Sequence, residues 1–183
     1  LLGALRFGAS RGKLDDEDWA VLEEVAPIFI LAMETQRAQS ELRERIKELT
    51  CLHGLAKLAA RNDLSLEETL EAAVSLLPPA WQHPAMASAL IEADGSRYET
   101  AGFCLGPCSQ EAPILVDGLR RGRVTVTYSA EISTDSGSAF LDWEERLIRA
   151  FARQVGLLLE RRRGEEERRK LQEQLRHADR LAT

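Results

Sequence analysis

Cysteine is scarce in this sequence, and long apolar runs are missing. The 183 residues include three cysteines, an odd number that favours a reducing compartment over a disulfide-bonded scaffold. The longest apolar runs, such as residues 28–33, are far too short to span a bilayer. The first ten residues lack the charged-then-apolar order of a signal peptide. These absences predict a cytoplasmic location and no direct membrane insertion.

Sequence motifs of common enzymes are missing as well. We find no G-x-x-x-x-G-K-[ST], no G-x-G-x-x-G and no H-E-x-x-H. The acidic clusters at 15–18 and 165–167 are better explained as a helix start and as surface charge than as metal ligands. The sequence therefore predicts no catalytic residue, no metal site and no cofactor.

Acidic residues outnumber basic residues, with 30 Asp and Glu against 24 Lys and Arg. The formal net charge of −6 argues against a nucleic-acid partner, because phosphate backbones attract clustered lysine and arginine. The hydrophobic content of 44% is enough to bury a core, and the 30% of charged residues is ordinary for a soluble protein. The length predicts one domain with additions, or parts of two.

Helical character dominates both ends of the sequence. Between residues 14 and 61 only Pro27 and Gly54 interrupt a helical pattern, and a last helix begins near Asp142 without a later stop signal. A coiled-coil spacing recurs at Leu42, Ile46 and Leu49. The same spacing on the last helix is first polar and then apolar, at Arg161, Gly164, Arg168, Leu171, Leu175 and Ala178. These seams predict a homodimer formed through paired helices.

The middle of the chain combines a short helix with strands. Ser65 and Glu68 form a capping box for a helix that Pro78 and Pro79 are expected to end. Asp94-Gly95 predicts a tight hairpin, and a second hairpin is expected with residues 119–121 at its tip. The predicted strands are 86–92, 97–103, 112–117 and 121–129, and the period of two at Val124, Val126 and Tyr128 indicates that the last of them is half-buried. This order predicts an α+β fold.

One strand–loop–helix pattern occurs twice. Residues 3–10 and 14–37 have the same order of features as residues 122–129 and 140–163. When residue 14 is set against residue 140, Val25 aligns with Phe151. The pattern predicts tandem copies of one module, of which the first is represented only by its last strand and helix. The alternative is that any strand–loop–helix unit has this appearance.

Several of these stretches resemble a known family. The segment RIKELTCLHGLAKLAARNDLSLEETLEAAVSLLPPAWQHP, with the later strands and LDWEERLIRAFARQVGLLLERR, resembles GAF-like sensor domains of bacterial sensor histidine kinases. The final LQEQLRHADRLAT resembles the opening of the dimerisation and phosphotransfer helix of such kinases. The resemblance covers roughly residues 45–163. It implies a GAF-like antiparallel sheet of about four to six strands, flanked by helices, with long N- and C-terminal signalling helices.

The resemblance also implies a domain organisation and a function. Residues 1–39 would end a preceding GAF-like domain, 40–62 would connect, 63–160 would form a small GAF-like domain, and 161–183 would be the outgoing signalling helix. The chain would be a regulatory module that passes a signal to an absent kinase core. It lacks the family's His-Glu box, so we expect no enzyme activity, and His177 matches a position before the phosphoacceptor.

Two alternatives stay open at this stage. A receptor for an unidentified small ligand would bind it between the sheet and the loop 104–111 and would use Trp81, His83, Tyr98 and Phe103. The connection of about eight residues before Ala112 leaves little room for a lid over such a pocket. In the plainer interpretation, Trp81 is a core residue and His83 lies on the surface. A redox sensor would pair Cys104 with Cys108 across the Gly-Pro turn. The plainer interpretation of these two cysteines is that they are incidental.

Overall fold

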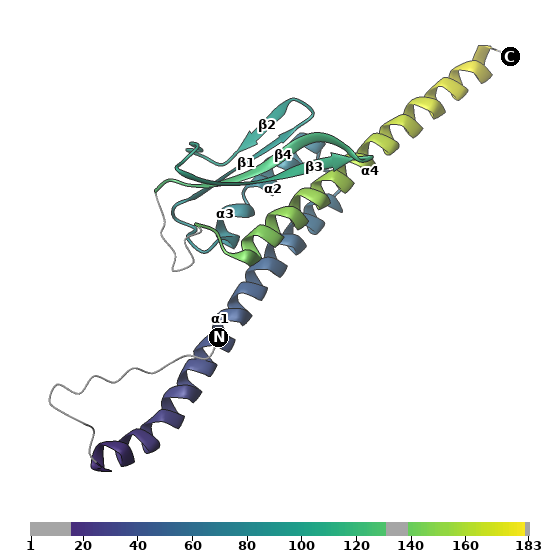
Figure 1. Ribbon diagram of the computed structural model, residues 1–183. Helices are drawn as coiled ribbons and strands as arrows, with labels where there is room; N and C mark the ends of the chain where they lie inside the picture. Colours follow the sequence, from purple (N-terminus) through teal and green to yellow (C-terminus); the bar gives the residue numbers. More distant parts are fainter. Residues whose placement is uncertain (1–15, 131–138, 182–183) are drawn as a thin grey trace. The chain divides into compact units, whose positions relative to one another are not determined.

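A computed structural model describes residues 16–130 and 139–181 of the chain (Figure 1). The elements in chain order are α1 (Asp16–Ala59), α2 (Leu66–Val74), α3 (Leu77–Ala80), β1 (Ala87–Ala93), β2 (Ser96–Glu99), β3 (Cys108–Val116), β4 (Leu119–Tyr128) and α4 (Asp142–Leu181). The α+β class predicted from the sequence is confirmed. The chain divides into two units, Leu1–Arg43 and Glu44–Thr183, and each is described by itself.

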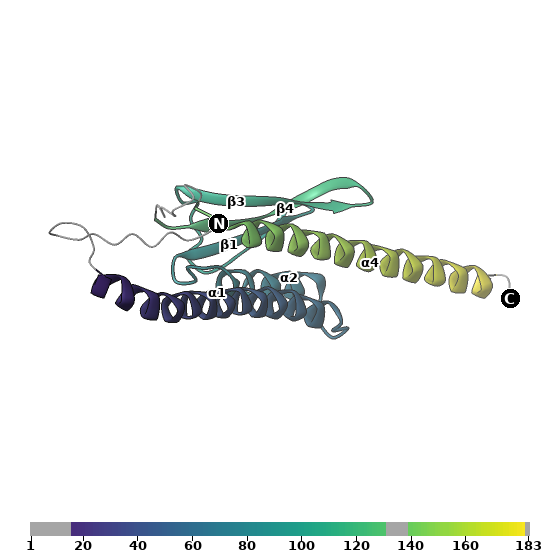
Figure 2. The same ribbon diagram turned by 60° about the horizontal axis from the view of Figure 1, so that its bottom comes forward.

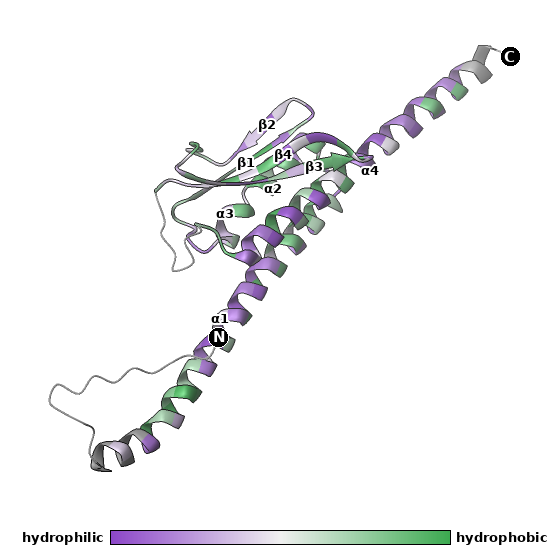
Figure 3. Cartoon of the chain, viewed as in Figure 1, coloured by the Kyte–Doolittle hydropathy of each residue, from purple (hydrophilic) through white to green (hydrophobic). Residues whose placement is uncertain are grey.

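The first unit contributes the helical segment from Asp16 to Arg43, with Pro27 inside the helix as the sequence predicts. This segment is coloured mostly as hydrophobic around residues 25–33 in Figure 3. Its exposed large apolar side chains include Val25, Ile28, Phe29, Ile30, Leu31 and Met33. The predicted strand at 3–10 lies outside the described residues.

The second unit is built around a four-stranded antiparallel sheet with the order β2-β1-β4-β3. Asp94 and Gly95 join β1 to β2, and both have positive φ, 49° and 87°, as the predicted tight hairpin requires. Residues Asp117 and Gly118 make the same kind of turn between β3 and β4, with φ of 51° and 75°. The sequence-based placement of residues 119–121 at this tip is therefore wrong, because β4 already begins at Leu119.

Two further boundaries differ from the prediction. Pro78 and Pro79 do not end a helix; they lie in α3, at positions where a helix leaves N–H groups unpaired anyway. The second strand stops at Glu99 rather than residue 103, since Phe103 N–H turns back to the Thr100 carbonyl, and β3 starts at Cys108, four residues early. The capping box of α2 is confirmed, with Ser65 and Glu68 each bonding the other's backbone N–H.

The helices of the second unit cover one face of the sheet (Figure 2). Alternate strand residues point into this layer, among them Ile91, Ile114, Val126 and Tyr128, and all are fully buried. The side chains that meet them from the helices include Leu55, Leu70, Leu77, Leu147, Ile148 and Phe151. This apolar layer is the core, and its period of two along the strands is the pattern seen in the sequence.

The opposite face of β4 is also covered. Thr125 and Thr127 are buried, although the sequence predicted β4 to be only half-buried. Thr127 lies against the loop 100–107, in which Gly106 N–H donates to Thr127 Oγ1 at 2.8 Å, whereas Thr125 Oγ1 lies 3.4 Å from Glu111 Oε1 on β3. An ideal Cβ at Gly106 would lie 1.9 Å from the Tyr128 carbonyl oxygen, so this loop position requires glycine.

A buried carboxylate joins the sheet to the start of α4. Glu144 is fully buried and accepts hydrogen bonds from Gln82 N–H at 2.8 Å, Leu141 N–H at 2.8 Å and the Tyr128 hydroxyl at 3.0 Å. Burial, and then the Glu144 carboxylate, raise the pKa of Tyr128 well above its ordinary value, so the phenol stays protonated and donates. One side chain thereby fixes the α3–β1 connection, the end of β4 and the first turn of α4.

We expect Glu144→Ala to lower the free energy of unfolding by about 3 kcal/mol, because buried N–H and O–H donors would lose their acceptor. The neighbouring Glu145 is exposed and pairs only with Arg149 on the same helix, so Glu145→Ala should cost less than about 0.5 kcal/mol. Urea denaturation followed by circular dichroism measures both. Equal losses in the two variants would contradict the role assigned to Glu144.

The helix α4 approaches β3 closely at one point. An ideal Cβ on Gly156 would lie 2.2 Å from the carbonyl oxygen of Leu115, whereas one on Gly164 would meet nothing within 4 Å. Gly156 is therefore needed for the contact between helix and strand, while Gly164 is not constrained inside its own chain.

These two glycines of α4 make a matched test. Gly156→Ala should destabilise the protein by about 2 kcal/mol, since backbone atoms of α4 and β3 would have to separate. Gly164→Ala should instead stabilise by up to about 1 kcal/mol through helix propensity. Thermal and urea denaturation give the sign of each change. A stabilised Gly156→Ala variant would show that the close contact with Leu115 is absent in solution.

Candidate functional site

The four residues predicted to line a ligand pocket lie in different environments. Trp81 is fully buried in the core, and its carbonyl accepts a hydrogen bond from Lys47 Nζ at 2.7 Å. Tyr98, opposite Ile91 in the sheet, points into the helix-covered face and is buried. Half-buried His83 packs edge-on against Tyr128, with ring centroids 5.8 Å apart, and Phe103 belongs to the loop 100–107.

The structure does not arrange these four side chains around one cavity. The sequence placed the pocket between the sheet and residues 104–111, but the second half of that segment is strand β3. Its first half contains Gly106, whose backbone touches β4 directly. The indole Nε1 of buried Trp81 has no hydrogen-bond partner among the described residues. Ligand binding by these residues stays a prediction that the geometry does little to favour.

The three cysteines are free thiols in distinct environments. Cys104 is exposed, Cys108 begins β3 and is half-buried, and Cys51 is buried in the core. Burial raises the pKa of the Cys51 thiol to about 12. Because the thiolate is the reactive form, Cys51 is protected both sterically and chemically.

We expect thiol titration of the native protein to detect Cys104 rapidly, Cys108 more slowly and Cys51 only after unfolding. Mild oxidation before the titration tests the redox interpretation: loss of the Cys104 and Cys108 signals together, without change in mass of the assembly, would support an internal disulfide. Retention of both signals would identify the two cysteines as incidental. Rapid labelling of Cys51 in the native state would contradict its burial.

The large apolar side chains of the predicted dimer seam are exposed in the structure. In the second unit, Ile46 and Leu49 on α1 are 54% and 66% exposed. On α4, Leu171 and Leu175 are 59% and 67% exposed. Leu42, in the first unit, is exposed as well, and the side chain of Ala178 lies outside the described residues. Figure 3 colours the part of α4 beyond the sheet mostly as hydrophilic, with a few separate hydrophobic positions.

The structure adds Leu157 to the seam on α4. Leu157 is 57% exposed and lies four residues before Arg161, so it has the spacing of the residues that follow. Sequence reasoning missed it because its neighbours 155, 158 and 159 pack into the core, and periodicity alone does not separate the two faces of α4. We call Ile46, Leu49, His53, Ala56 and Ala60 the incoming seam, and Leu157, Arg161, Gly164, Arg168, Leu171 and Leu175 the outgoing seam.

The two seams meet in a shallow groove of about 290 Å³. Ala56 and Ala60 of the incoming seam line one wall, and Leu157 and Arg161 of the outgoing seam line the other. Ala59, Gln154 and Leu158 complete it. The small alanine side chains leave the two helices accessible at this point, so a helix from another molecule could contact both at once.

Other kinds of site find no support in the described part of the chain. Within residues 16–130 and 139–181, no group of three or more His, Cys, Asp or Glu side chains is placed to hold a metal ion. No described helix combines the length and the apolar character needed to cross a membrane. Comparison with known protein families and with curated proteins finds no match for the sequence.

Proposed function

We propose that the chain is a dimeric signalling module, the cytoplasmic regulatory portion of a sensor histidine kinase. In this proposal a small GAF-like domain at residues 63–160 joins an incoming helix to an outgoing helix. The outgoing helix leads to a kinase core outside this chain. The chain itself transmits a signal and catalyses no reaction.

The observation that carries the proposal is the junction of the two exposed seams. Ala56 and Ala60 lie across one groove from Leu157 and Arg161, so the incoming and outgoing seams open on the same side of the domain. A single two-fold axis along that side can therefore pair both helices with their counterparts in a second copy. Two seams on opposite sides of the domain would have required two different partners.

The exposed side chains supply a driving force for this pairing. Ile46, Leu49, Leu157, Leu171 and Leu175 are each more than half exposed, and burying such a side chain contributes about 1.5–3 kcal/mol. A strict spacing of three and four residues is the spacing at which such residues interlock between parallel helices. The charged residues between them suit the flanks of a helix pair.

The outgoing seam has a weak section where signalling would act. Arg161, Gly164 and Arg168 separate Leu157 from Leu171, and the Arg161 guanidinium pairs with Glu165 on its own helix at 2.8 Å. Two-fold pairing brings like charges together here, so the section stabilises the dimer less than leucine would. Switching requires two arrangements of comparable free energy, and a weak seam favours this condition more than an all-leucine seam would.

The test replaces the weak section. In Arg161→Leu/Arg168→Leu, the dissociation constant of the dimer should fall at least tenfold, equivalent to about 1.4 kcal/mol, because like charges are exchanged for apolar contacts. Light scattering and sedimentation over a range of concentrations measure it.

The matched control carries the same two substitutions off the seam. Arg169 and Arg176 each follow a seam position by one residue and are exposed, so Arg169→Leu/Arg176→Leu should change the dissociation constant less than about threefold. An equal fall of the dissociation constant in both double variants would indicate nonspecific hydrophobic association. A monomer at all concentrations in both variants would overturn the proposal.

A further inference from the structure

Four consecutive residues of α4 face four different directions at the point where the helix leaves the sheet. They are Glu160, Arg161, Arg162 and Arg163, and because each residue turns the helix by about 100°, together they nearly encircle it. Arg161 lies in the outgoing seam. The other three bond to three separate parts of the same domain, and we call these three residues the collar.

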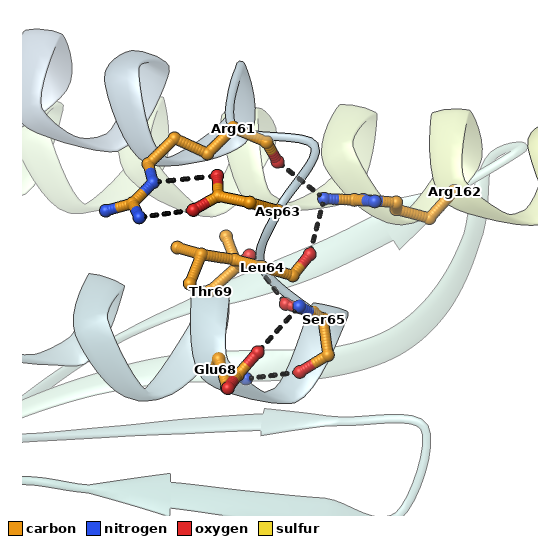
Figure 4. Close-up of polar contacts among 7 residues, drawn as sticks. All are labelled: Arg61, Asp63, Leu64, Ser65, Glu68, Thr69 and Arg162. Carbon is orange, nitrogen blue, oxygen red and sulfur yellow. Dashed lines mark hydrogen bonds and ion pairs between the residues drawn. The ribbon is translucent and has the colours of Figure 1, made fainter.

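Arg162 binds the loop that joins the incoming helix to α2 (Figure 4). Its guanidinium donates to the carbonyl oxygens of Arg61 at 3.0 Å and Leu64 at 3.1 Å. Both residues follow Ala59, where α1 ends, so Arg162 holds the chain directly after the helix and not the carbonyl groups of the helix itself.

The loop that Arg162 holds is itself fixed at both sides. Arg61 forms a two-bond ion pair with Asp63, which raises the arginine pKa and lowers the carboxyl pKa. Ser65 follows Leu64 and caps α2 together with Glu68. Figure 4 shows the two carbonyl groups of the loop directed at the one guanidinium. A displacement of the end of α1 is therefore passed to Arg162.

Arg163 binds the hairpin between β1 and β2. One of its nitrogens lies 2.6 Å from each carboxylate oxygen of Asp94, the first residue of the turn. Both side chains are about one-third exposed, at 35% and 36%, so the ion pair is partly shielded from solvent. The planar guanidinium favours a restricted set of orientations toward a carboxylate, which makes the contact sensitive to rotation of α4.

Glu160 binds the other hairpin. Its carboxylate accepts a hydrogen bond from Asp117 N–H at 2.8 Å, in the turn between β3 and β4. One turn earlier, Gly156 lies against the Leu115 carbonyl of the same hairpin. Both hairpins and the loop after α1 are thus bonded to a single turn of α4.

The arginines of this region do not form an anion site. A hollow of about 390 Å³ beside Ser65 is lined by Arg162 and Arg169 but also by Glu165 and Glu166, so its charges balance. The donors of Arg162 that the structure describes are directed at carbonyl oxygens. The region is built for internal contacts.

We propose that the collar of Glu160, Arg162 and Arg163 sets the rotational phase of the outgoing helix. The inference rests on the proposed function, because Arg161, the remaining residue of the four, is the one the collar turns toward the seam. If α4 turned about its axis by the angle between two consecutive residues, about 100°, the contacts of Glu160, Arg162 and Arg163 would all break. A neighbouring residue would then take the place of Arg161 in the outgoing seam. A stimulus felt by either hairpin or by the incoming helix therefore reaches the outgoing seam through the collar.

The experiment measures the orientation of α4 within one chain. Spin labels at Glu71→Cys on α2 and Lys170→Cys on α4, in a Cys104→Ser/Cys108→Ser background that retains buried Cys51, report one distance by pulsed electron paramagnetic resonance. Excess unlabelled protein keeps each measurement within a single chain. We expect one narrow distance peak in the labelled protein without further changes. In Arg162→Gln/Arg163→Gln we expect the distance distribution to become broad or to shift.

The matched control removes two arginines for which the described residues include no hydrogen bond or ion pair to the hairpins or to the loop after α1. Arg169→Gln/Arg176→Gln should keep the narrow peak, since Arg169 pairs with Glu173 on its own helix. If Arg162→Gln/Arg163→Gln fails to fold, Asp94→Asn decides the matter: it replaces the carboxylate that pairs with Arg163 by a neutral amide, at a turn position where asparagine tolerates the positive φ.

The possible results separate the two proposals. An unchanged narrow peak in the folded collar variant, or in Asp94→Asn, overturns the collar even if light scattering finds a stable dimer. A broadened peak in a chain that is monomeric at all concentrations supports the collar as an anchor while the dimeric function fails.

Discussion

The carboxylate of Glu144 is the contact on which the arrangement of the domain depends. It lies in the first turn of α4, yet its three donors come from the segment before β1, the segment before α4 and the last residue of β4. Lys47 of α1 bonds the carbonyl of Trp81, the residue next to one of those donors. The carbonyl of Trp81 and the N–H of Gln82 belong to one peptide group, so Lys47 and Glu144 bind the two sides of that group and tie four elements distant in sequence together. A buried acceptor with several donors is costly to disturb, because each donor loses its partner without gaining water.

The helix α4 serves two purposes along its length. Up to Leu159 one side lies under the sheet, where Leu147, Ile148, Phe151 and Val155 are fully buried. From Leu157 onward a different side carries the outgoing seam, so over one turn the helix serves the core and the seam together. The anchors from Glu160 to Arg163 lie where this change occurs. A continuous hydrogen-bonded helix is stiff over this distance, so its orientation at the domain is carried to Leu171 and Leu175.

The covering of the sheet's second face bears on the choice between a helix-based and a ligand-based mechanism. Loop 100–107 rests on β4 through Gly106 and the buried Thr127. A pocket for a drug-sized ligand needs an enclosed volume between such a loop and the sheet. The contact distance at Gly106 leaves no such volume at that point. The exposed helical seams, by contrast, leave apolar surface that a partner can cover.

The sequence by itself determined the elements whose signals are local. Four features depend only on neighbours in the chain and are present in the structure. They are the capping box at Ser65, the Asp94-Gly95 turn, the period of two in β4 and the length of the two long helices. The exposed leucines of the seams followed from spacing alone. Tertiary structure decided what depends on distant partners: the burial of Glu144 among three donors, the need for glycine at 106 and 156, and the inclusion of Leu157 in the seam. It also decided that three consecutive arginines, alike in sequence, have different partners: Arg161 pairs with Glu165 on its own helix, Arg162 binds the loop after α1, and Arg163 binds a hairpin. Local patterns fix backbone conformation, whereas the surroundings of a side chain are set by segments that the chain brings together only when it folds.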